Sequence, residues 1–345
     1  MSKRIAFFNH KGGVSKTTSV YNLGWMLSKK YRVLVVDADP QCNLSSLILG
    51  DDFEKYYIDE STKEQNIKDG VKVAFEGKPY PIKEINCLSP QRAQNLFLLA
   101  GHANLSEYES SLTFALTSSR SLATLQNLPG AFAELLRLTE NKFNIDYTLM
   151  DLNPSFSAIN QNFFIISNGF LVPTNPDPFS IMALNTLRTI LPNWYDWKIS
   201  MMQGFKDAAY PLPETTPYFF GTIIQRFNIR RGRAAEPYRN NIYEIKEITR
   251  NQLFTALSKA SMVLPLGKYE QANISPANGF CLQEISDFQS LLPKAYDAGI
   301  PVFDLTDEEL KATGPVLEQL QEKRQMFYGL FENMSNQIIE ILKNV

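Results

Sequence analysis

Short apolar runs alternate with stretches of helical periodicity along most of this chain. Apolar runs predict buried strands at 4–8, 33–36, 96–99, 147–150, 170–172, 219–225, 262–264 and 301–303. Apolar positions three or four residues apart predict helices at 16–30, 131–138, 181–191 and about 315–345. Alternation of this kind is typical of the α/β class, and predicts a mostly parallel twisted sheet with helices on both faces.

Two stretches do not follow this alternation. Residues 51–95 are charged and lack clear periodicity, whereas residues 193–218 are rich in aromatic residues and carry Pro211, Pro213 and Pro217. We interpret both as elaborations between core elements. A chain of 345 residues is long enough for two domains of about 150 residues, although α/β folds of about 250 residues also form one.

Composition narrows the class of protein. The 44% apolar and 20% charged content is ordinary for a globular protein, and the net charge of −2 excludes a uniformly basic nucleic-acid coat but not a local basic patch. Three distant cysteines and two histidines exclude a disulfide framework and a Cys/His-rich metal site. We expect a cytoplasmic protein, because no signal peptide is recognised and no apolar run approaches the roughly 18 residues of a membrane span.

A glycine-containing loop joins the first predicted strand to the first predicted helix. It reads Asn9-His10-Lys11-Gly12-Gly13-Val14-Ser15-Lys16-Thr17-Thr18. Backbone N–H groups of such a loop and the positive end of the helix converge on phosphate oxygens, which glycine allows to approach closely. We expect Lys16 to reach the β- and γ-phosphates and the Thr17 hydroxyl to bind Mg²⁺.

The spacing within this loop differs from the standard phosphate-loop pattern. Counted back from Lys16, the two expected glycines fall on His10 and Ser15, and a second lysine, Lys11, precedes the Gly-Gly pair. The loop resembles the deviant Walker A motif of the ParA/MinD family of P-loop ATPases, in which the position of Ser15 is more usually glycine. The resemblance implies a P-loop NTPase fold, ATP and Mg²⁺ as ligands, and a Lys11 that acts across a dimer interface on the partner's nucleotide. The alternative for Lys11 is a solvated loop lysine.

Three aspartates follow predicted strands. Asp37 and Asp39 close the second strand, and Asp151 closes the 147–150 strand, so all three belong to one edge of a parallel sheet. By the resemblance, Asp39 orients and activates the attacking water, Asp37 holds an Mg²⁺-bound water or the loop, and Asp151 holds Mg²⁺ through water. The alternative for Asp37 and Asp39 is a cap or turn former, and for Asp151 it is a structural role at the strand end. The family commonly has two prolines where this chain has Asn153-Pro154.

The resemblance covers about 1–50, 95–190, 219–240 and 280–305, and it suggests Gln225 and Pro301 as adenine contacts. Because these elements are spread along the chain, we predict a single P-loop ATPase domain over 1–345, with elaborations at about 51–95 and 193–218 and a C-terminal helix at about 315–345.

A local arginine cluster lies in the nearly neutral chain. Arginine suits phosphate because its planar donors form paired bonds, and ParA-like ATPases bind DNA non-specifically as ATP dimers. The cluster therefore predicts DNA binding and nucleoid association, or alternatively a role at the dimer interface or a solvated loop. Its members are Arg226, Arg230, Arg231, Arg233 and Arg239.

The resemblance predicts a slow, Mg²⁺-dependent ATPase that forms an ATP-dependent sandwich dimer, binds DNA non-specifically for plasmid or chromosome partition, and is stimulated by a partner protein. The segment Ile338–Val345 has Lys343 as its one base, so we expect no membrane anchor. Two alternatives remain: a nucleotide-gated regulatory or scaffolding subunit of a phage-defence, secretion or mobile-element system, and a nucleotide sensor without hydrolysis.

Overall fold

A seven-stranded parallel sheet forms the centre of the computed structural model, which describes residues 2–117, 125–230 and 233–345. The strand order is β3-β2-β4-β1-β5-β6-β9, and a separate hairpin pairs β7 with β8. The strands are β1 Lys3–Phe7, β2 Val33–Ala38, β3 Leu96–Leu99, β4 Tyr147–Leu152, β5 Gly169–Thr174, β6 Tyr218–Gln225, β7 Ile229–Arg230, β8 Arg233–Ala234 and β9 Cys281–Ile285. This sheet confirms the predicted α/β class.

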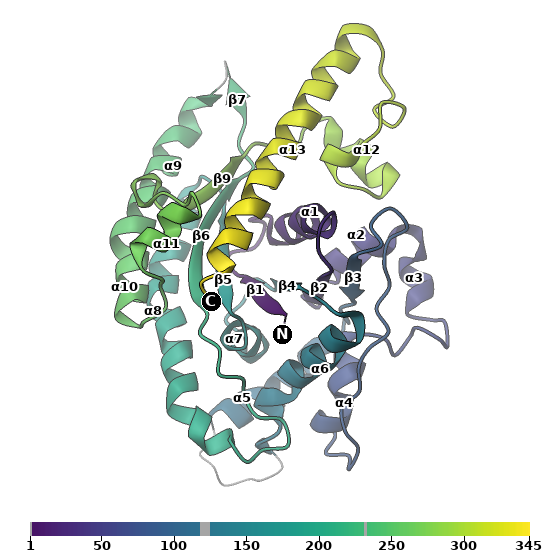
Figure 1. Ribbon diagram of the computed structural model, residues 1–345, viewed down its shortest axis with the longest axis vertical. Coiled ribbons are helices and arrows are strands. Elements are labelled where there is room, and N and C mark those ends of the chain that lie inside the picture. The colour runs from purple at the N-terminus through teal and green to yellow at the C-terminus, as the bar shows by residue number, and fades with distance from the viewer. Residues whose placement is uncertain (1, 118–124, 231–232) are drawn as a thin grey trace.

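Helices cover both faces of the sheet. Figure 1 shows α1 and α13 on one side of the strands and α6 and α7 on the other, while α8 to α11 lie beyond β6. The helices are α1 Lys16–Ser28, α2 Asn43–Leu49, α3 Phe53–Tyr56, α4 Ile67–Phe75, α5 Glu109–Thr117, α6 Leu128–Phe143, α7 Ala158–Ile165, α8 Pro178–Met201, α9 Glu236–Ile248, α10 Phe254–Lys259, α11 Leu266–Gln271, α12 Leu291–Ala298 and α13 Gly314–Leu342. Because both faces are covered, β2 and β5 are buried at every position.

Two strand predictions are wrong. Residues 262–264 form no strand, and the 301–303 run lies in a single 3₁₀ turn, Val302–Asp304. The edge strand is instead β9, which follows a left-handed residue at Phe280 and pairs with β6. Apolar content alone did not separate buried strands from buried turns, because both lie against the same core.

The aromatic-rich elaboration begins as helix. The helix predicted at 181–191 continues past Pro192 to Met201. Only the part of the elaboration after Met201 is therefore outside this helix. Lys198 on this helix is fully buried, and its ammonium donates to the Ile165 carbonyl (2.7 Å), the Thr215 hydroxyl (2.9 Å) and the Thr215 carbonyl. Lys198 therefore ties the segment before β6 to the end of α7.

None of the helices described is long and apolar enough to cross a bilayer. The C-terminal helix α13 instead packs its apolar face on α1 and β9 (Figure 1). Its buried side chains include Phe327, Phe331 and Ile338.

Replacing Lys198 by alanine is expected to lower the free energy of unfolding by about 2–4 kcal/mol, because two carbonyls lose their donor and a cavity forms. Burial lowers the pKa of Lys198 to about 7, so between pH 7 and about 10 the unfolded chain binds this proton more tightly than the folded chain. The deficit should therefore grow as pH rises through this window. Urea unfolding at two pH values measures the difference in unfolding free energy between the wild type and Lys198→Ala. The exposed Lys206→Ala is the control. A difference that shrinks as pH rises would contradict the lowered pKa of Lys198.

Candidate functional site

The phosphate loop occupies the sheet edge where β1 ends and α1 begins. Gly13 has φ of 70° and Ser15 has φ of 62°, both left-handed. For a serine this conformation costs roughly 1–2 kcal/mol, which explains why glycine suits the position better. The Ser15 carbonyl nevertheless accepts the Ser19 N–H (2.9 Å), so α1 starts directly after the loop.

Lys16 is buried inside the loop. Its ammonium donates to the carbonyls of Asn9 (3.0 Å) and Lys11 (3.3 Å), and burial lowers its pKa. Backbone carbonyls of the loop thus bind the Lys16 ammonium, which the sequence predicts to reach the β- and γ-phosphates.

Lys11 lies in a different environment, partly open to solvent. Its ammonium pairs with the carboxylate of Asp177 and lies 3.2 Å from the Ser180 hydroxyl, both at the start of α8. Asp177 also caps α8 by accepting the Ser180 N–H (2.8 Å). The structure therefore pairs Lys11 with a residue of its own chain.

Asp151 brings a buried carboxyl group to the same edge. The carboxylate is 1% exposed, and neither oxygen accepts a hydrogen bond of good geometry. Burial, followed by the nearby charge of Asp37, raises the pKa of Asp151 to about 8, and the Thr17 hydroxyl offsets part of that rise. A buried carboxylate without donors, next to a threonine hydroxyl, fits a hydrated Mg²⁺ ion.

The other two aspartates differ in their surroundings. Asp39 lines the cavity beside the phosphate loop and accepts the Gln41 N–H (3.0 Å). Asp37 is fully buried, is not among the residues that line this cavity, and accepts hydrogen bonds from Ser45 and Asp39. Of the two predicted roles of Asp37, this environment favours holding the loop.

The loop after β4 contacts the phosphate loop although it lacks the second proline of the family pattern. The Asn160 amide donates to the carbonyl (2.8 Å) and the side-chain oxygen (2.9 Å) of Asn153, and to the Ser155 carbonyl (2.7 Å). This holds Phe156 where its ring stacks on His10, with centroids 4.3 Å apart. Asn160 provides the rigidity that a proline would otherwise give.

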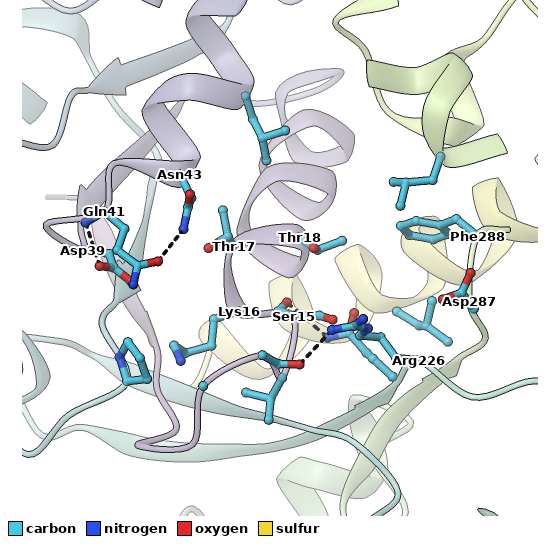
Figure 2. Close-up of a pocket in the computed structure, with 18 of the residues that line it drawn as sticks. Ser15, Lys16, Thr17, Thr18, Asp39, Gln41, Asn43, Arg226, Asp287 and Phe288 are labelled. Atoms are coloured by element: carbon cyan, nitrogen blue, oxygen red, sulfur yellow. Dashed lines mark hydrogen bonds between the residues drawn. The ribbon is translucent and has the colours of Figure 1, made fainter. Parts of the chain in front are cut away.

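A cavity of about 650 Å³ is lined by the loop residues Gly12–Thr18 and by Asp39. Figure 2 shows Asp39 and Gln41 on one side of Lys16, Thr17 and Thr18, and Arg226, Asp287 and Phe288 on the other. Asp287 and Phe288 were not predicted, since they follow the missed strand β9.

The two adenine candidates occupy different places. Gln225 lines the cavity but is 2% exposed, and its amide donates to the Ser19 hydroxyl (2.5 Å) and the Ser15 carbonyl (3.4 Å), so it supports the start of α1. Pro301 lines an adjoining slot of about 170 Å³ between α1, α2 and α12, which shares Thr18, Ser46 and Phe288 with the main cavity.

The described members of the arginine cluster lie on different elements. Arg226 adopts a left-handed conformation (φ 60°), lines the cavity and donates to the Gly13 carbonyl (3.2 Å). Arg239 is exposed on α9. Arg230 and Arg233 pair through their backbones in the β7–β8 hairpin, and Arg231 lies outside the described residues.

Comparison with known proteins supports the assignment that the loop suggests. A family model described as an AAA domain matches residues 2–198. The chain belongs to this family, as a ParA/MinD-type P-loop ATPase. An uncharacterised protein of Methanocaldococcus jannaschii is 32% identical to this ATPase over 218 residues, which cover 62% of this chain and 75% of that protein.

A second relative is the sporulation initiation inhibitor protein Soj of Bacillus subtilis, 28% identical over 195 residues, or 55% of this ATPase and 66% of Soj. The chain spans only 51% of an uncharacterised Mycobacterium tuberculosis relative, at 30% identity.

Two solved structures share the fold. The pNOB8 ParA bound to nonspecific DNA has a TM-score of 0.55 at 19% identity, covering 100% of this ATPase and 99% of that chain. An ATP complex of a McdA variant from Cyanothece has a TM-score of 0.54 at 18% identity, covering 93% and 96%.

Replacing Arg226 by alanine is expected to weaken the binding of Mg·ATP by about tenfold, because the guanidinium lies in the cavity and orients the phosphate loop. Arg239→Ala removes the same charge from an exposed helix and should leave nucleotide affinity within about twofold. Titration with a fluorescent ATP analogue measures both. Equal ATP affinities in the two variants would contradict a role of Arg226 in nucleotide binding.

Proposed function

We propose that this protein is a Mg²⁺-dependent ATP hydrolase that forms an ATP-dependent sandwich dimer and binds DNA without sequence preference, in plasmid or chromosome partition. One observation carries the proposal: Lys11, Lys16, Asp39 and Asp151 converge on one sheet edge beside a cavity large enough for a nucleotide. The residues come from β1, β2 and β4 and their following loops.

Each residue has a role that follows from its position. The backbone N–H groups of Gly12–Thr18 and the start of α1 bind the phosphates, and Lys16 exchanges its loop carbonyls for phosphate oxygens. Thr17 and Asp151 would hold the Mg²⁺ ion, which supplies positive charge at the β- and γ-phosphates. Asp39, at the rim of the same cavity, accepts a hydrogen bond from the attacking water and orients it.

Lys11 acts on the nucleotide of a second protomer in this proposal. Its pair with Asp177 leaves the two side chains 19% and 34% exposed, and partly exposed pairs contribute only about 0.2–1 kcal/mol. Release of Lys11 therefore costs little against the gain from a phosphate in a water-poor interface, where such a cation contributes up to about 10³–10⁵ in rate.

DNA binding and the biological role rest on the relatives. A neighbour of the same fold is a ParA bound to nonspecific DNA, and the exposed Arg239 is a candidate for phosphate contact. Nucleoid association would follow from such binding, and a partner protein would accelerate the slow turnover.

Replacing Asp39 by alanine is expected to keep ATP binding while lowering turnover by at least about 100-fold, because the attacking water loses its acceptor. The variant should elute as a dimer with ATP on size exclusion and retain random duplex DNA on a filter at low salt. The wild type without nucleotide is the control. A monomer with ATP would refute the sandwich dimer, and no ATP-dependent retention would favour a scaffolding role without DNA.

Replacing Asp177 by asparagine is expected to shift the ATP-dependent dimer to a protein concentration about five- to thirtyfold lower, because the symmetric dimer releases two Lys11–Asp177 pairs. Asparagine still caps α8 but no longer pairs with Lys11, so the ion-pair energy of roughly 0.5–1 kcal/mol is not spent on release. Sedimentation with a non-hydrolysable ATP analogue measures the shift. Asp196→Asn, exposed on the same helix, changes charge equally and should leave dimerisation unchanged; equal behaviour of both variants would contradict the pairing argument.

A further inference from the structure

Asp37 is enclosed by hydrogen-bond donors of its own chain. One carboxylate oxygen accepts both the backbone N–H (2.8 Å) and the hydroxyl (2.7 Å) of Ser45, and the other accepts the Asp39 N–H (3.3 Å). The side chain is fully buried, and burial raises its pKa to about 6 although the Ser45 bonds oppose the rise. Its hydrogen bonds thus turn it toward α2 and the Asp39 loop.

The helix α2 depends on this carboxylate for its first turn. Its N-cap, Cys42, has φ of 54° and makes no side-chain cap bond. The Ser45 N–H is one of the first-turn donors that no helical carbonyl can satisfy. The Asp37 carboxylate, at the end of β2, accepts this Ser45 N–H and so replaces the side-chain N-cap that α2 lacks.

Ser45 carries the connection further, to the end of β3. Its hydroxyl donates to Asp37 and accepts the N–H of Gly101 (2.9 Å). A Cβ at Gly101 would lie 3.0 Å from the Asp37 carboxyl carbon, so a larger residue there would require Asp37 to shift. The Gly101 carbonyl in turn accepts the hydroxyl of Tyr57 (2.8 Å), which belongs to the 51–95 elaboration.

The segment between Asp37 and Ser45 carries Asp39. Asp37 holds its first part through the Asp39 N–H, and Ser45 holds its last part through two bonds to the same carboxylate. The segment is therefore anchored on both sides of Asp39, whose side chain reaches the cavity rim. Displacing a water-orienting group by about 1 Å costs up to roughly 10²-fold in rate.

We propose that Ser45 is a positioning residue for hydrolysis, which, together with Asp37 and Gly101, holds the loop so that Asp39 meets the attacking water. Asp37 then serves as the anchor of α2 and not as a ligand of the Mg²⁺-bound water. The inference rests on the proposed ATPase function, and it adds a part of the elaboration, Tyr57, to the support of the site.

Replacing Ser45 by alanine tests the proposal in the full chain. The variant removes the hydroxyl that joins Asp37 to Gly101 but keeps the Ser45 N–H in place. Turnover of Mg·ATP should fall about tenfold, while KM, the Mg²⁺ concentration for half-maximal rate and the affinity for an ATP analogue stay within about twofold. Ser167→Ala is the matched control, since Ser167 is equally buried and donates to the Phe164 carbonyl in α7 from the segment before β5, at the opposite end of the sheet from the loop.

The outcomes separate this inference from the function that it builds on. A wild type that binds ATP without hydrolysing it contradicts the proposed function and this inference with it. Wild-type turnover in Ser45→Ala contradicts the positioning role alone, as does a loss of nucleotide affinity or Mg²⁺ response in proportion to the loss of rate.

A second variant covers the case in which Ser45→Ala does not fold. Tyr57→Phe removes only the hydroxyl on the Gly101 carbonyl and should lower turnover about threefold, again without a change in nucleotide affinity. Unchanged turnover in Tyr57→Phe would overturn the link to the elaboration.

Discussion

Charge buried at one edge of the sheet is the constraint on which the rest of the site depends. Lys16, Asp37 and Asp151 all lie beneath the surface where β1, β2 and β4 end. Taking an ion out of water costs several kcal/mol unless partners replace its hydration. The partners differ at each position: loop carbonyls for Lys16, Ser45 and Asp39 donors for Asp37, and no well-formed hydrogen bond for Asp151. The incomplete hydrogen bonding of Asp151 is what supports the proposed Mg²⁺ site.

The two lysines of the loop differ in burial and therefore in the partners of their ammonium groups. Lys16 is held by two backbone carbonyls of its own loop, those of Asn9 and Lys11. Lys11 is held by a carboxylate at the start of another helix, in a pair open enough to be weak. The Lys16 ammonium is thus buried among carbonyls, whereas the Lys11 ammonium lies in a partly exposed ion pair, as the proposed action on a second protomer requires.

Residues outside the motif support it through contacts that connect distant segments. Asn160 holds the loop after β4 against the phosphate loop, and Tyr57 reaches from the 51–95 elaboration to Gly101. Lys198 similarly ties the later elaboration to α7. Tyr57 therefore supports the edge of the sheet that carries the site, whereas Lys198 acts at the opposite end, where β5 and β6 begin.

The sequence by itself determined the fold class, the phosphate loop and the aspartates, because local apolar runs and strand-end residues are read from neighbours along the chain. It did not find β9, since Gln283 and Glu284 interrupt the apolar residues of that strand, whereas the false strands at 262–264 and 301–303 contain no polar side chain. Only the tertiary structure separated Arg226, which reaches the Gly13 carbonyl, from Arg239 on its exposed helix. The tertiary structure also distinguished Asp37, which is enclosed, from Asp39, which lies two residues away and lines the cavity. Burial and hydrogen-bond partners come from segments far apart in the chain, and no local pattern encodes which of them meet.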